Sequence, residues 1–277
     1  MRYLVSQTPT IMPALSLRNF GKAVVIPFLL VATLSACATP EGYVARDGIN
    51  DPFEERNRKV HAFNKSIDQA ILRPASRGYN KVLPPEMRMM VNNFSDNLSG
   101  PGLVVNNLLQ GNFKGAITNT YRFALNSTLG FAGLVDVAEM AGVSEVDTDF
   151  GETLHVWGVG EGHYVETPFR GPSTERDTVG MVVDFFTNPL SYAMSGTTNE
   201  YRQGVRVLDI VGDRGRFGDT IDSVLYDSAD SYAQSRLIYL QSRRFALGRS
   251  GDATYDDPYA IGTTDPYDDP YEDPYAE

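Results

Sequence analysis

The single cysteine of this 277-residue chain, Cys37, is the feature that most limits how the chain is built. It excludes an intrachain disulfide and a multi-cysteine metal site, so the fold must depend on its own packing. Cys37 follows an apolar run over residues 23–34 and two small residues, Ser35 and Ala36. Residues 1–36 carry three basic side chains and no acidic one. A basic segment followed by a short apolar segment is typical of an export signal.

The apolar run predicts a signal peptide over residues 1–36. Its length of roughly 12 residues falls short of the roughly 20 that a membrane-spanning helix needs. A cysteine after small residues matches the bacterial lipoprotein signal, so we expect lipid, including palmitate, on Cys37. Two or three lipid chains, at about 0.8 kcal/mol per buried methylene, hold a protein on a membrane. Ala38 favours the periplasmic face of the outer membrane, and a start at Met12 instead of Met1 leaves the cleavage site unchanged.

The charge of the chain is concentrated at its end. From Cys37 onward, 21 basic and 35 acidic side chains give a net charge of −14, which is unsuited to nucleic-acid binding. Nine of the acids lie in residues 251–277, where Asp-Pro-Tyr occurs four times and no base occurs. We therefore predict a disordered acidic tail over 249–277, with docking through its tyrosines as the alternative. The remainder divides into a linker over 37–50 and one helical domain over 51–248.

Apolar residues recur at helical spacing through most of the domain, which predicts an all-α fold. Asp51-Pro52-Phe53-Glu54 places an acid, a proline and a glutamate where a helix begins. Arg73-Pro74 is expected to end that first helix, because proline disfavours helical backbone before it. Further helices are predicted over residues 84–98, 103–110, 113–129, 173–186, 200–211 and 221–247.

Breaks between these helices come from short motifs. Gly100-Pro101-Gly102 and Gly111-Asn112 are expected to interrupt the chain, and Ser173-Thr174-Glu175 is expected to open a helix. A brief strand-like alternation occurs at Leu154-His155-Val156-Trp157. It lies in a glycine-rich connection over residues 150–172.

Two predicted helical segments, 101–110 and 181–190, are apolar on more than one side. A helix of this kind lies in a large core or against lipid, and both alternatives remain open for any one segment. Phe185 and Phe186 are adjacent, so a helix cannot turn both rings toward one core. Aromatic rings also favour the boundary between membrane and water. The candidate membrane-facing residues are Phe185, Phe186, Leu190 and Tyr192.

Recognisable catalytic motifs are missing from the sequence. The histidines are His61, His155 and His163, and their spacing does not fit a zinc site. No G-x-S-x-G motif occurs, and the glycines at 158–162 do not fit a nucleotide-binding loop. We expect no enzyme activity, no metal and no cofactor.

A series of short motifs runs through residues 51–190. The motifs occupy residues 51–58, 63–64, 72–74, 78–79, 92–98, 105–111, 122–130, 133–136, 149–154, 157–160, 168, 171–174 and 176–177. In content and order they resemble the MlaA/VacJ family of outer-membrane lipoproteins. Residues from 200 onward match that family only loosely, and the Asp-Pro-Tyr tail is peculiar to this chain.

The resemblance implies a single ring-shaped helical domain in the inner leaflet of the outer membrane, beside a porin trimer. Such proteins offer a channel through which phospholipids misplaced in the outer leaflet reach a periplasmic carrier, MlaC, which preserves lipid asymmetry. A structural or scaffold lipoprotein that binds a porin without moving lipid is the alternative. Glycines in this connection would serve as a hinge or as plain tight turns. The candidate channel or gating residues are Gly158, Gly160, Gly162, Arg170, Arg176 and Asp177.

Overall fold

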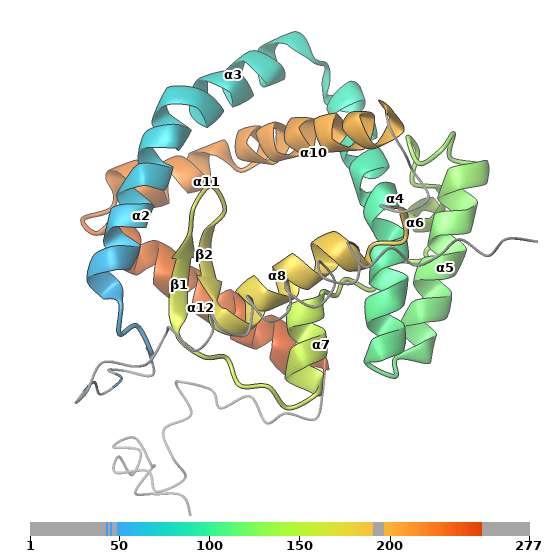
Figure 1. Ribbon diagram of the computed structural model, residues 1–277. Coiled ribbons are helices and arrows are strands. Elements are labelled where there is room, and N and C mark those ends of the chain that lie inside the picture. The colour runs from blue at the N-terminus through green and yellow to red at the C-terminus, as the bar shows by residue number, and fades with distance from the viewer. Residues whose placement is uncertain (1–42, 44, 46–48, 191–196, 251–277) are drawn as a thin grey trace, which may run out of the picture. The chain divides into compact units, whose positions relative to one another are not determined.

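The computed structural model describes residues 43, 45, 49–190 and 197–250. Residues 1–45 and 46–277 form two separate units, and the described helices and strands lie in the second. This second unit is mostly helical, as predicted, but it also contains a two-stranded hairpin that the all-α prediction did not include (Figure 1). Cys37, Tyr192 and residues 251–277 lie outside the described residues, so the expectations for them stay predictions.

The elements follow in chain order. They are α2 (Glu54–Ile67), a π-helical turn (Asp68–Leu72), α3 (Arg73–Val82), α4 (Pro85–Leu109), α5 (Phe113–Thr128), α6 (Val137–Met140), α7 (Phe150–Val156), β1 (Tyr164–Thr167), β2 (Gly171–Thr174), α8 (Glu175–Thr187), α10 (Thr197–Arg216), α11 (Gly218–Asp222), a second π-helical turn (Ser223–Asp227) and α12 (Ser231–Ser250). Over the described ranges, no helix combines the length and the apolar character that crossing a bilayer requires.

The predicted ends of the first helix were wrong. Helix α2 begins at Glu54, and Asp51 is buried, where it accepts a hydrogen bond from Asn57 at 2.9 Å. The helical path continues past Ile67 through the π-helical turn into α3. Pro74 lies in the first turn of α3, directly after the π-helical turn, in which the Arg73 N–H donates to the Asp68 carbonyl.

The predicted break at Gly100-Pro101-Gly102 was also wrong, because α4 runs through it. Gly100 lies against Phe123 of α5, where an added Cβ would lie 3.5 Å from the Cδ2 atom of the ring. On the other side, Asn188 Nδ2 donates to the Leu98 carbonyl at 3.4 Å. Packing on both sides therefore holds a helix across a sequence that would break an isolated one.

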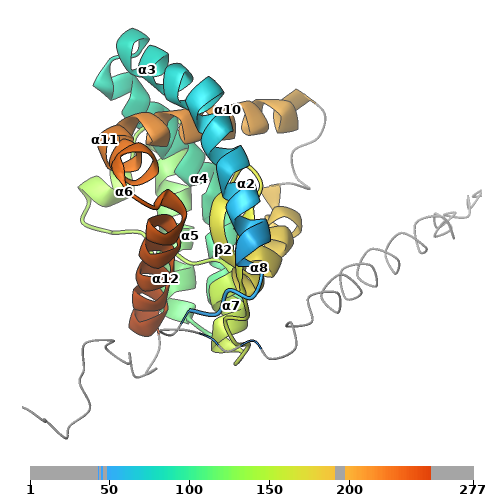
Figure 2. The ribbon, with the colours of Figure 1, turned by 90° about the vertical axis from the view of Figure 1, so that its left-hand side faces the viewer.

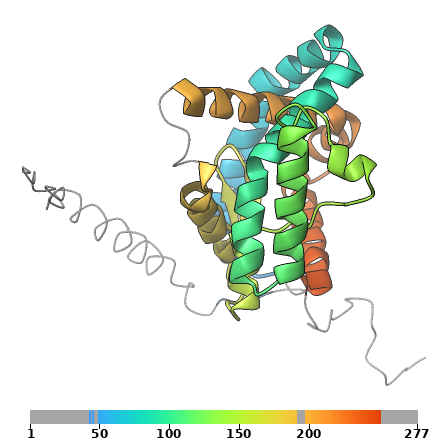
Figure 3. The same cartoon turned by 90° about the vertical axis from the view of Figure 1, so that its right-hand side faces the viewer.

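The predicted turn at Gly111-Asn112 is confirmed. Asn112 caps α5 by accepting a hydrogen bond from the Gly115 N–H at 2.9 Å. Helices α4 and α5 then lie side by side and antiparallel (Figure 3). Gly111 ends α4 with φ of 75°, a backbone conformation that favours glycine. A glycine followed by an asparagine therefore marks the end of one helix and the start of the next, and this signal can be read from the sequence alone.

The strand-like alternation at 154–157 was misleading, since residues 150–156 form helix α7. Strand pairing occurs instead in the β1–β2 hairpin, with Tyr164 opposite Thr174 and Thr167 opposite Gly171. The predicted start of α8 is confirmed: the Thr174 side chain accepts a hydrogen bond from the Asp177 N–H at 3.2 Å.

The single helix predicted over residues 221–247 is wrong, because the chain breaks between Asp227 and Ser231. Asp230 fixes the break. Its Oδ1 accepts a hydrogen bond from the Ala233 N–H at 3.0 Å, and its carboxylate binds the Arg58 guanidinium of α2 at 2.8 and 3.0 Å. A local cap and a partner 172 residues away therefore fix together where α12 begins.

The contacts between elements form a closed circuit. Helix α2 leads into α3, α3 packs on α10, α10 on α4, and α4 on α7 and α8. Helix α8 then contacts the β1–β2 hairpin, whose first strand contacts α2. Helix α12 packs on β2 and on the second π-helical turn, on the side of the molecule that Figure 2 shows. In Figure 1 the hairpin extends from the side of α8 toward α10.

Candidate functional site

The distribution of polar and apolar side chains is inverted relative to a domain surrounded by water. Among the described residues, seven hydrophobic side chains are buried, against 21 polar or charged ones. In the same part of the chain, 28 large hydrophobic side chains are exposed. Water-surrounded domains bury most large aliphatic residues and rarely expose extended apolar surface. The inverted pattern suits a protein that has lipid around it and polar groups within.

The interior polar groups pair with one another. Buried His61 of α2 lies with Nδ1 3.1 Å from Glu166 Oε1 and Nε2 3.0 Å from Ser231 Oγ. Buried Asn57 donates to the Tyr164 carbonyl at 3.1 Å. These bonds join α2 to β1 and α12. Hydrogen bonds between buried side chains therefore hold these elements together, as apolar packing does in most domains.

The predicted membrane-facing aromatic residues are exposed. Phe185 and Phe186 of α8 are 60% and 50% exposed, and their rings meet edge to face at 5.2 Å between centroids. Leu190, after the end of α8, is partly buried, and Tyr192 lies outside the described residues. Helix α5 presents a further exposed apolar stripe, Phe113, Ile117 and Tyr121 at four-residue spacing. Contact of Phe185 and Phe186 with lipid stays a prediction.

Replacing Phe185 and Phe186 together with serine is expected to lower vesicle binding at least about tenfold, because both rings would lose lipid contact. The unfolding transition in detergent should change little. Flotation with vesicles measures binding when the protein is made without its lipid anchor. Leu240→Ser is the contrasting variant: Leu240 is 2% exposed, so serine there should destabilise the fold. Unfolding of the Phe185/Phe186 variant without a separate binding defect would contradict the prediction.

The glycines of the candidate gating segment serve different purposes. Gly158 and Gly162 have φ of 85° and 75°, a conformation that favours glycine. An added Cβ at Gly158 or Gly160 would meet nothing within 4 Å, whereas at Gly162 it would lie 2.6 Å from Glu175 Oε2. Gly162 therefore permits the close approach of Glu175, whose carboxylate accepts a hydrogen bond from the His163 N–H at 3.1 Å. The structure accounts for Gly158 and Gly162 as turn residues, and gating stays a prediction.

Arg176 and Asp177 belong to a buried ionic network. Asp177 accepts hydrogen bonds from Tyr239 at 2.6 Å and from Arg243 at 3.1 Å, both on α12. Arg176 lies 3.3 Å from Asp177, and Arg243 also reaches Asp149, the cap of α7, at 2.7 Å. Burial alone would raise the pKa of Asp177, but the bonds from Arg243 and Tyr239 outweigh it and lower that pKa. The network joins α7, α8 and α12.

Arg170 lies apart from these two residues, in the exposed turn of the β1–β2 hairpin. Neighbouring atoms partly desolvate the Arg170 guanidinium and so lower its pKa; the charge of Arg206 on α10 adds to the effect, while Asp184 on α8 opposes it. The pKa of Arg202 is also lowered, mainly by burial and secondly by the charge of Arg206. The charge of Arg206 therefore acts on Arg170 in the hairpin turn and on Arg202 of its own helix.

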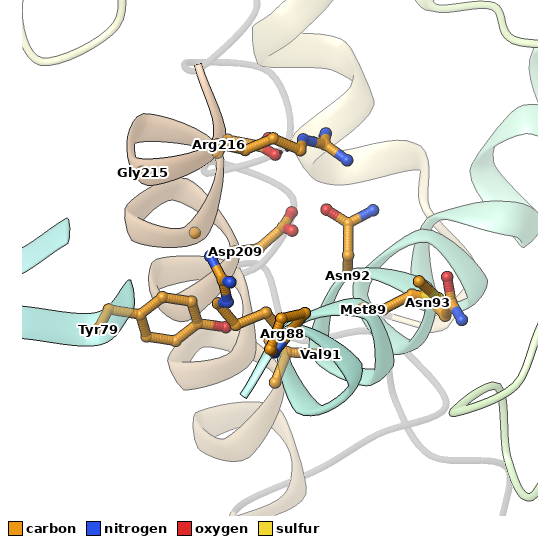
Figure 4. Close-up of a pocket in the computed structure, with 12 residues that line it drawn as sticks. Tyr79, Arg88, Met89, Val91, Asn92, Asn93, Asp209, Gly215 and Arg216 are labelled. Carbon is orange, nitrogen blue, oxygen red and sulfur yellow. Dashed lines mark hydrogen bonds and ion pairs between the residues drawn. The ribbon is translucent and has the colours of Figure 1, made fainter. Parts of the chain in front are cut away.

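A cavity of about 450 Å³ lies between α3, α4 and α10 (Figure 4). Its polar lining includes Tyr79, Arg88, Asn92 and Asp209, and Figure 4 shows Arg88 beside the Tyr79 ring and Asn92 facing the side of Asp209. Burial raises the pKa of Asp209, and the nearby charge of Asp213 adds to this, whereas a hydrogen bond from Ser95 lowers it. Throughout the described residues, no group of three or more His, Cys, Asp or Glu side chains is arranged to hold a metal ion.

Sequence reasoning missed this cavity and the arginines of α10. The polar residues of the cavity come from α3 and α4 and, more than 100 positions later, from α10, and none belongs to a catalytic motif. The one available signal was the recurrence of charged residues along a single face of α10, at Arg202, Arg206, Asp209 and Asp213.

Comparison with known proteins decides the family. The profile of the MlaA lipoprotein family matches residues 49–246. The chain belongs to the MlaA lipoprotein family. It is 34% identical over 224 residues to the Escherichia coli K12 protein named intermembrane phospholipid transport system lipoprotein MlaA, covering 79% of this chain and 87% of that protein.

Further relatives extend the MlaA comparison. The MlaA protein of Haemophilus influenzae is 28% identical over 230 residues, covering 82% of this chain and 90% of the relative. An uncharacterized protein of Rickettsia typhi is 36% identical over 200 residues, covering 72% and 78%. A solved chain from work described as "Structural basis for maintenance of bacterial outer membrane lipid asymmetry" superposes with a TM-score of 0.61 at 34% identity. The match covers 71% of this chain and 98% of the solved one.

Proposed function

We propose that this protein removes misplaced phospholipids from the outer leaflet of the outer membrane and passes them to a periplasmic carrier of the MlaC type. Relatives named for intermembrane phospholipid transport support the substrate class. The observation that carries the proposal is the inverted polarity, with 21 buried polar side chains and 28 exposed large hydrophobic ones among the described residues. A protein that moves lipid between leaflets needs apolar groups toward the tails and polar groups toward the headgroup.

The arrangement we propose for this activity is a ring embedded in one leaflet. The closed circuit of contacts from α2 through α3, α10, α4 and α8 to the hairpin would form its wall. Exposed apolar residues on α5 and α8 would meet lipid tails, while polar groups on α10 and in the hairpin turn would face the headgroup path. A porin trimer beside the ring and a lipid anchor on Cys37 complete the proposal.

The mechanism we propose involves no covalent chemistry. Transfer of a lipid requires a continuous polar surface for its headgroup and room for its tails, without a nucleophile paired with a base. The competing function is a scaffold that binds a porin without moving lipid. If the protein is a scaffold, substitutions in the polar surface that we assign to the headgroup should not affect its function. If the protein transports lipid, the same substitutions should stop transport.

Complementation tests the proposal. The gene is placed in a bacterial strain that lacks its own MlaA-family protein, and phospholipid exposed on the cell surface is quantified. We expect the wild-type chain to lower surface phospholipid to the level of the parent strain. Normal porin assembly with no change in surface phospholipid would support the scaffold function instead.

The lipid anchor gives a second expected result. Cys37→Ser should abolish incorporation of labelled palmitate, because the chain holds no other cysteine to accept it. The product should be an unprocessed precursor or a soluble form absent from outer-membrane fractions. Thr39→Ser, two residues away, is the control and should be labelled normally. Palmitate on the Cys37→Ser protein would refute this anchor.

A further inference from the structure

The cavity between α3, α4 and α10 is large enough to hold a ligand. Its volume of about 450 Å³ lies within the range of roughly 300–1,000 Å³ that small-molecule sites occupy. Its lining holds four charged side chains, Arg88, Asp209, Asp213 and Arg216. Asp213 and Arg216 neutralise each other in an ion pair at 2.8 Å. Arg88 and Asp209 remain, and among the residues that the structure describes neither forms an ion pair.

The hydroxyl of Tyr79 is an unused hydrogen-bond donor in the lining of this cavity. Tyr79 is 9% exposed, and over the described ranges its hydroxyl has no hydrogen-bond partner. Its ring packs on Gly212 of α10, where an added Cβ would lie 3.3 Å from Cε1 and 3.6 Å from the hydroxyl oxygen. Burial raises the pKa of Tyr79, so the hydroxyl keeps its proton at neutral pH. Because buried hydroxyls normally have a partner, this donor is available to a ligand.

Arg88 lies beside the Tyr79 ring and is only partly bonded (Figure 4). Its Nη1 donates to the neutral amide of Asn80 at 2.7 Å, and its buried Nε has no partner. The Nε and Nη2 atoms of the guanidinium are therefore without an acceptor in the described part of the chain. A phosphate can accept two parallel hydrogen bonds from one guanidinium. Arg88 and the Tyr79 hydroxyl together form a side of the cavity that suits a phosphate.

Asp209 and Asn92 have the opposite requirement. Ser95 donates to Asp209 Oδ2 at 2.9 Å, and Asp209 Oδ1 has no partner among the described residues. Asn92 donates through Nδ2 to Asp96 at 2.8 Å, which turns its amide oxygen toward Asp209 (Figure 4). Two acceptors that face each other need a donor between them. A primary ammonium supplies three N–H donors together with the positive charge that Asp209 lacks.

We propose that this cavity binds the headgroup of a phospholipid that carries both a phosphate and a primary amine, as phosphatidylethanolamine does. The phosphate binds Arg88 and the Tyr79 hydroxyl, and the ammonium lies between Asp209 and Asn92. A zwitterion satisfies both sets of groups at once, whereas a free phosphate or a simple cation satisfies only one. Met89 adds apolar surface to the lining for the glycerol and the first tail carbons. The inference rests on the proposed transport function and adds a headgroup preference to it.

Binding of short-chain lipids to the purified full-length protein in detergent tests the headgroup site. Dihexanoyl phosphatidylethanolamine is compared with dihexanoyl phosphatidylglycerol, which keeps the phosphate and lacks the amine. We expect the wild type to bind the ethanolamine lipid about tenfold or more tightly, because only that lipid brings an ammonium to Asp209. Asp209→Asn should abolish this preference by weakening the ethanolamine lipid alone.

Two substitutions on the donor side of the cavity should weaken both lipids alike. Arg88→Gln removes the positive charge that holds the phosphate. Tyr79→Phe removes only a hydroxyl that has no partner among the described residues, so the unfolding transition should not change. The controls Asp227→Asn, in the second π-helical turn, and Tyr121→Phe, on α5, make the same chemical changes at exposed positions and should bind as the wild type does.

Each result separates the possibilities. A wild type that binds the two lipids equally overturns the headgroup site, and so does a preference that survives in Asp209→Asn. Unchanged binding of both lipids in Arg88→Gln and Tyr79→Phe overturns it as well. Glycerophosphoethanolamine carries the same headgroup without tails; if it binds as tightly as the lipid, the cavity serves a soluble zwitterion and the lipid site is overturned.

The complementation assay distinguishes this site from the transport function. A wild type that fails to clear surface phospholipid refutes transport. If the wild type clears it, and Asp209→Asn clears ethanolamine and glycerol lipids in the same proportion as the wild type does, only the headgroup site is refuted.

Discussion

Asp177→Asn is expected to destabilise the folded domain by about 3–5 kcal/mol, because it removes the shared counterion of buried arginines. Asp177 is 9% exposed and binds Tyr239, Arg243 and Arg176 at 2.6 to 3.3 Å. A neutral amide would leave both guanidinium groups short of negative charge and would present an N–H₂ group to donors. Chemical denaturation in detergent, followed by circular dichroism, measures the loss.

The matched control for this network is the exposed pair between Glu161 and Arg244, which meet at 2.9 Å. Glu161→Gln should change stability by less than about 1 kcal/mol, since solvent screens an exposed pair. Equal losses in Asp177→Asn and Glu161→Gln would contradict the role given to burial.

The same carboxyl gives a pH dependence with a definite sign. The pKa of Asp177 is lower in the folded protein than in the unfolded chain, where an aspartate titrates near about 3.9. Its contribution is therefore complete above that unfolded value and is lost as pH falls toward the folded value. Between about pH 5 and pH 3, the wild type should lose more stability than Asp177→Asn does.

Gly180→Ala is expected to destabilise the fold by about 3 kcal/mol or more, because backbone atoms occupy the space that its Cβ needs. At Gly180 an added Cβ would lie 2.3 Å from the Gly151 nitrogen and 2.6 Å from the Gly151 Cα. Backbone cannot rotate away as a side chain does, so α7 would have to move off α8. That movement would also strain the hydrogen bond from Phe150 N–H to Asp184.

Gly78→Ala in α3 is the matched control. An added Cβ there meets nothing within 4 Å, so alanine should stabilise the helix by about 0.5–1 kcal/mol. Thermal melts of the two variants should therefore shift in opposite directions from the wild type. Shifts of the same sign would mean that the approach of α7 to α8 is looser than the structure indicates.

Sequence motifs predicted correctly those helix caps and turns whose hydrogen-bond partners lie within a few residues along the chain. The cap at Thr174 and the turn at Gly111-Asn112 involve partners within three residues, and both were predicted correctly. The passage of α4 through Pro101 depends on Asn188, which is far away in sequence, and no local pattern carries that information. The break before Ser231 combines a local cap by Asp230 with its ion pair to distant Arg58.

The candidate site divides in the same way. The sequence identified Arg176 and Asp177 as notable, but the partners of Asp177, Tyr239 and Arg243, lie more than 60 residues downstream, on another helix. It also singled out Arg170, whose neighbour Arg206 comes from a segment with only loose family resemblance. Residue type and order predicted which positions to examine, and the tertiary fold determined which of them meet.

The hydrogen-bonded interior has a calorimetric consequence. Newly hydrated apolar surface raises the heat capacity of a protein on unfolding, whereas newly hydrated polar surface lowers it. Here the described interior holds 21 polar or charged side chains against seven hydrophobic ones, and much of the apolar surface is exposed from the start. The heat capacity increment per residue should therefore fall below the about 12–15 cal/mol/K of typical domains. The stability curve of this protein would be broad and shallow, changing little with temperature over the range in which its membrane stays fluid.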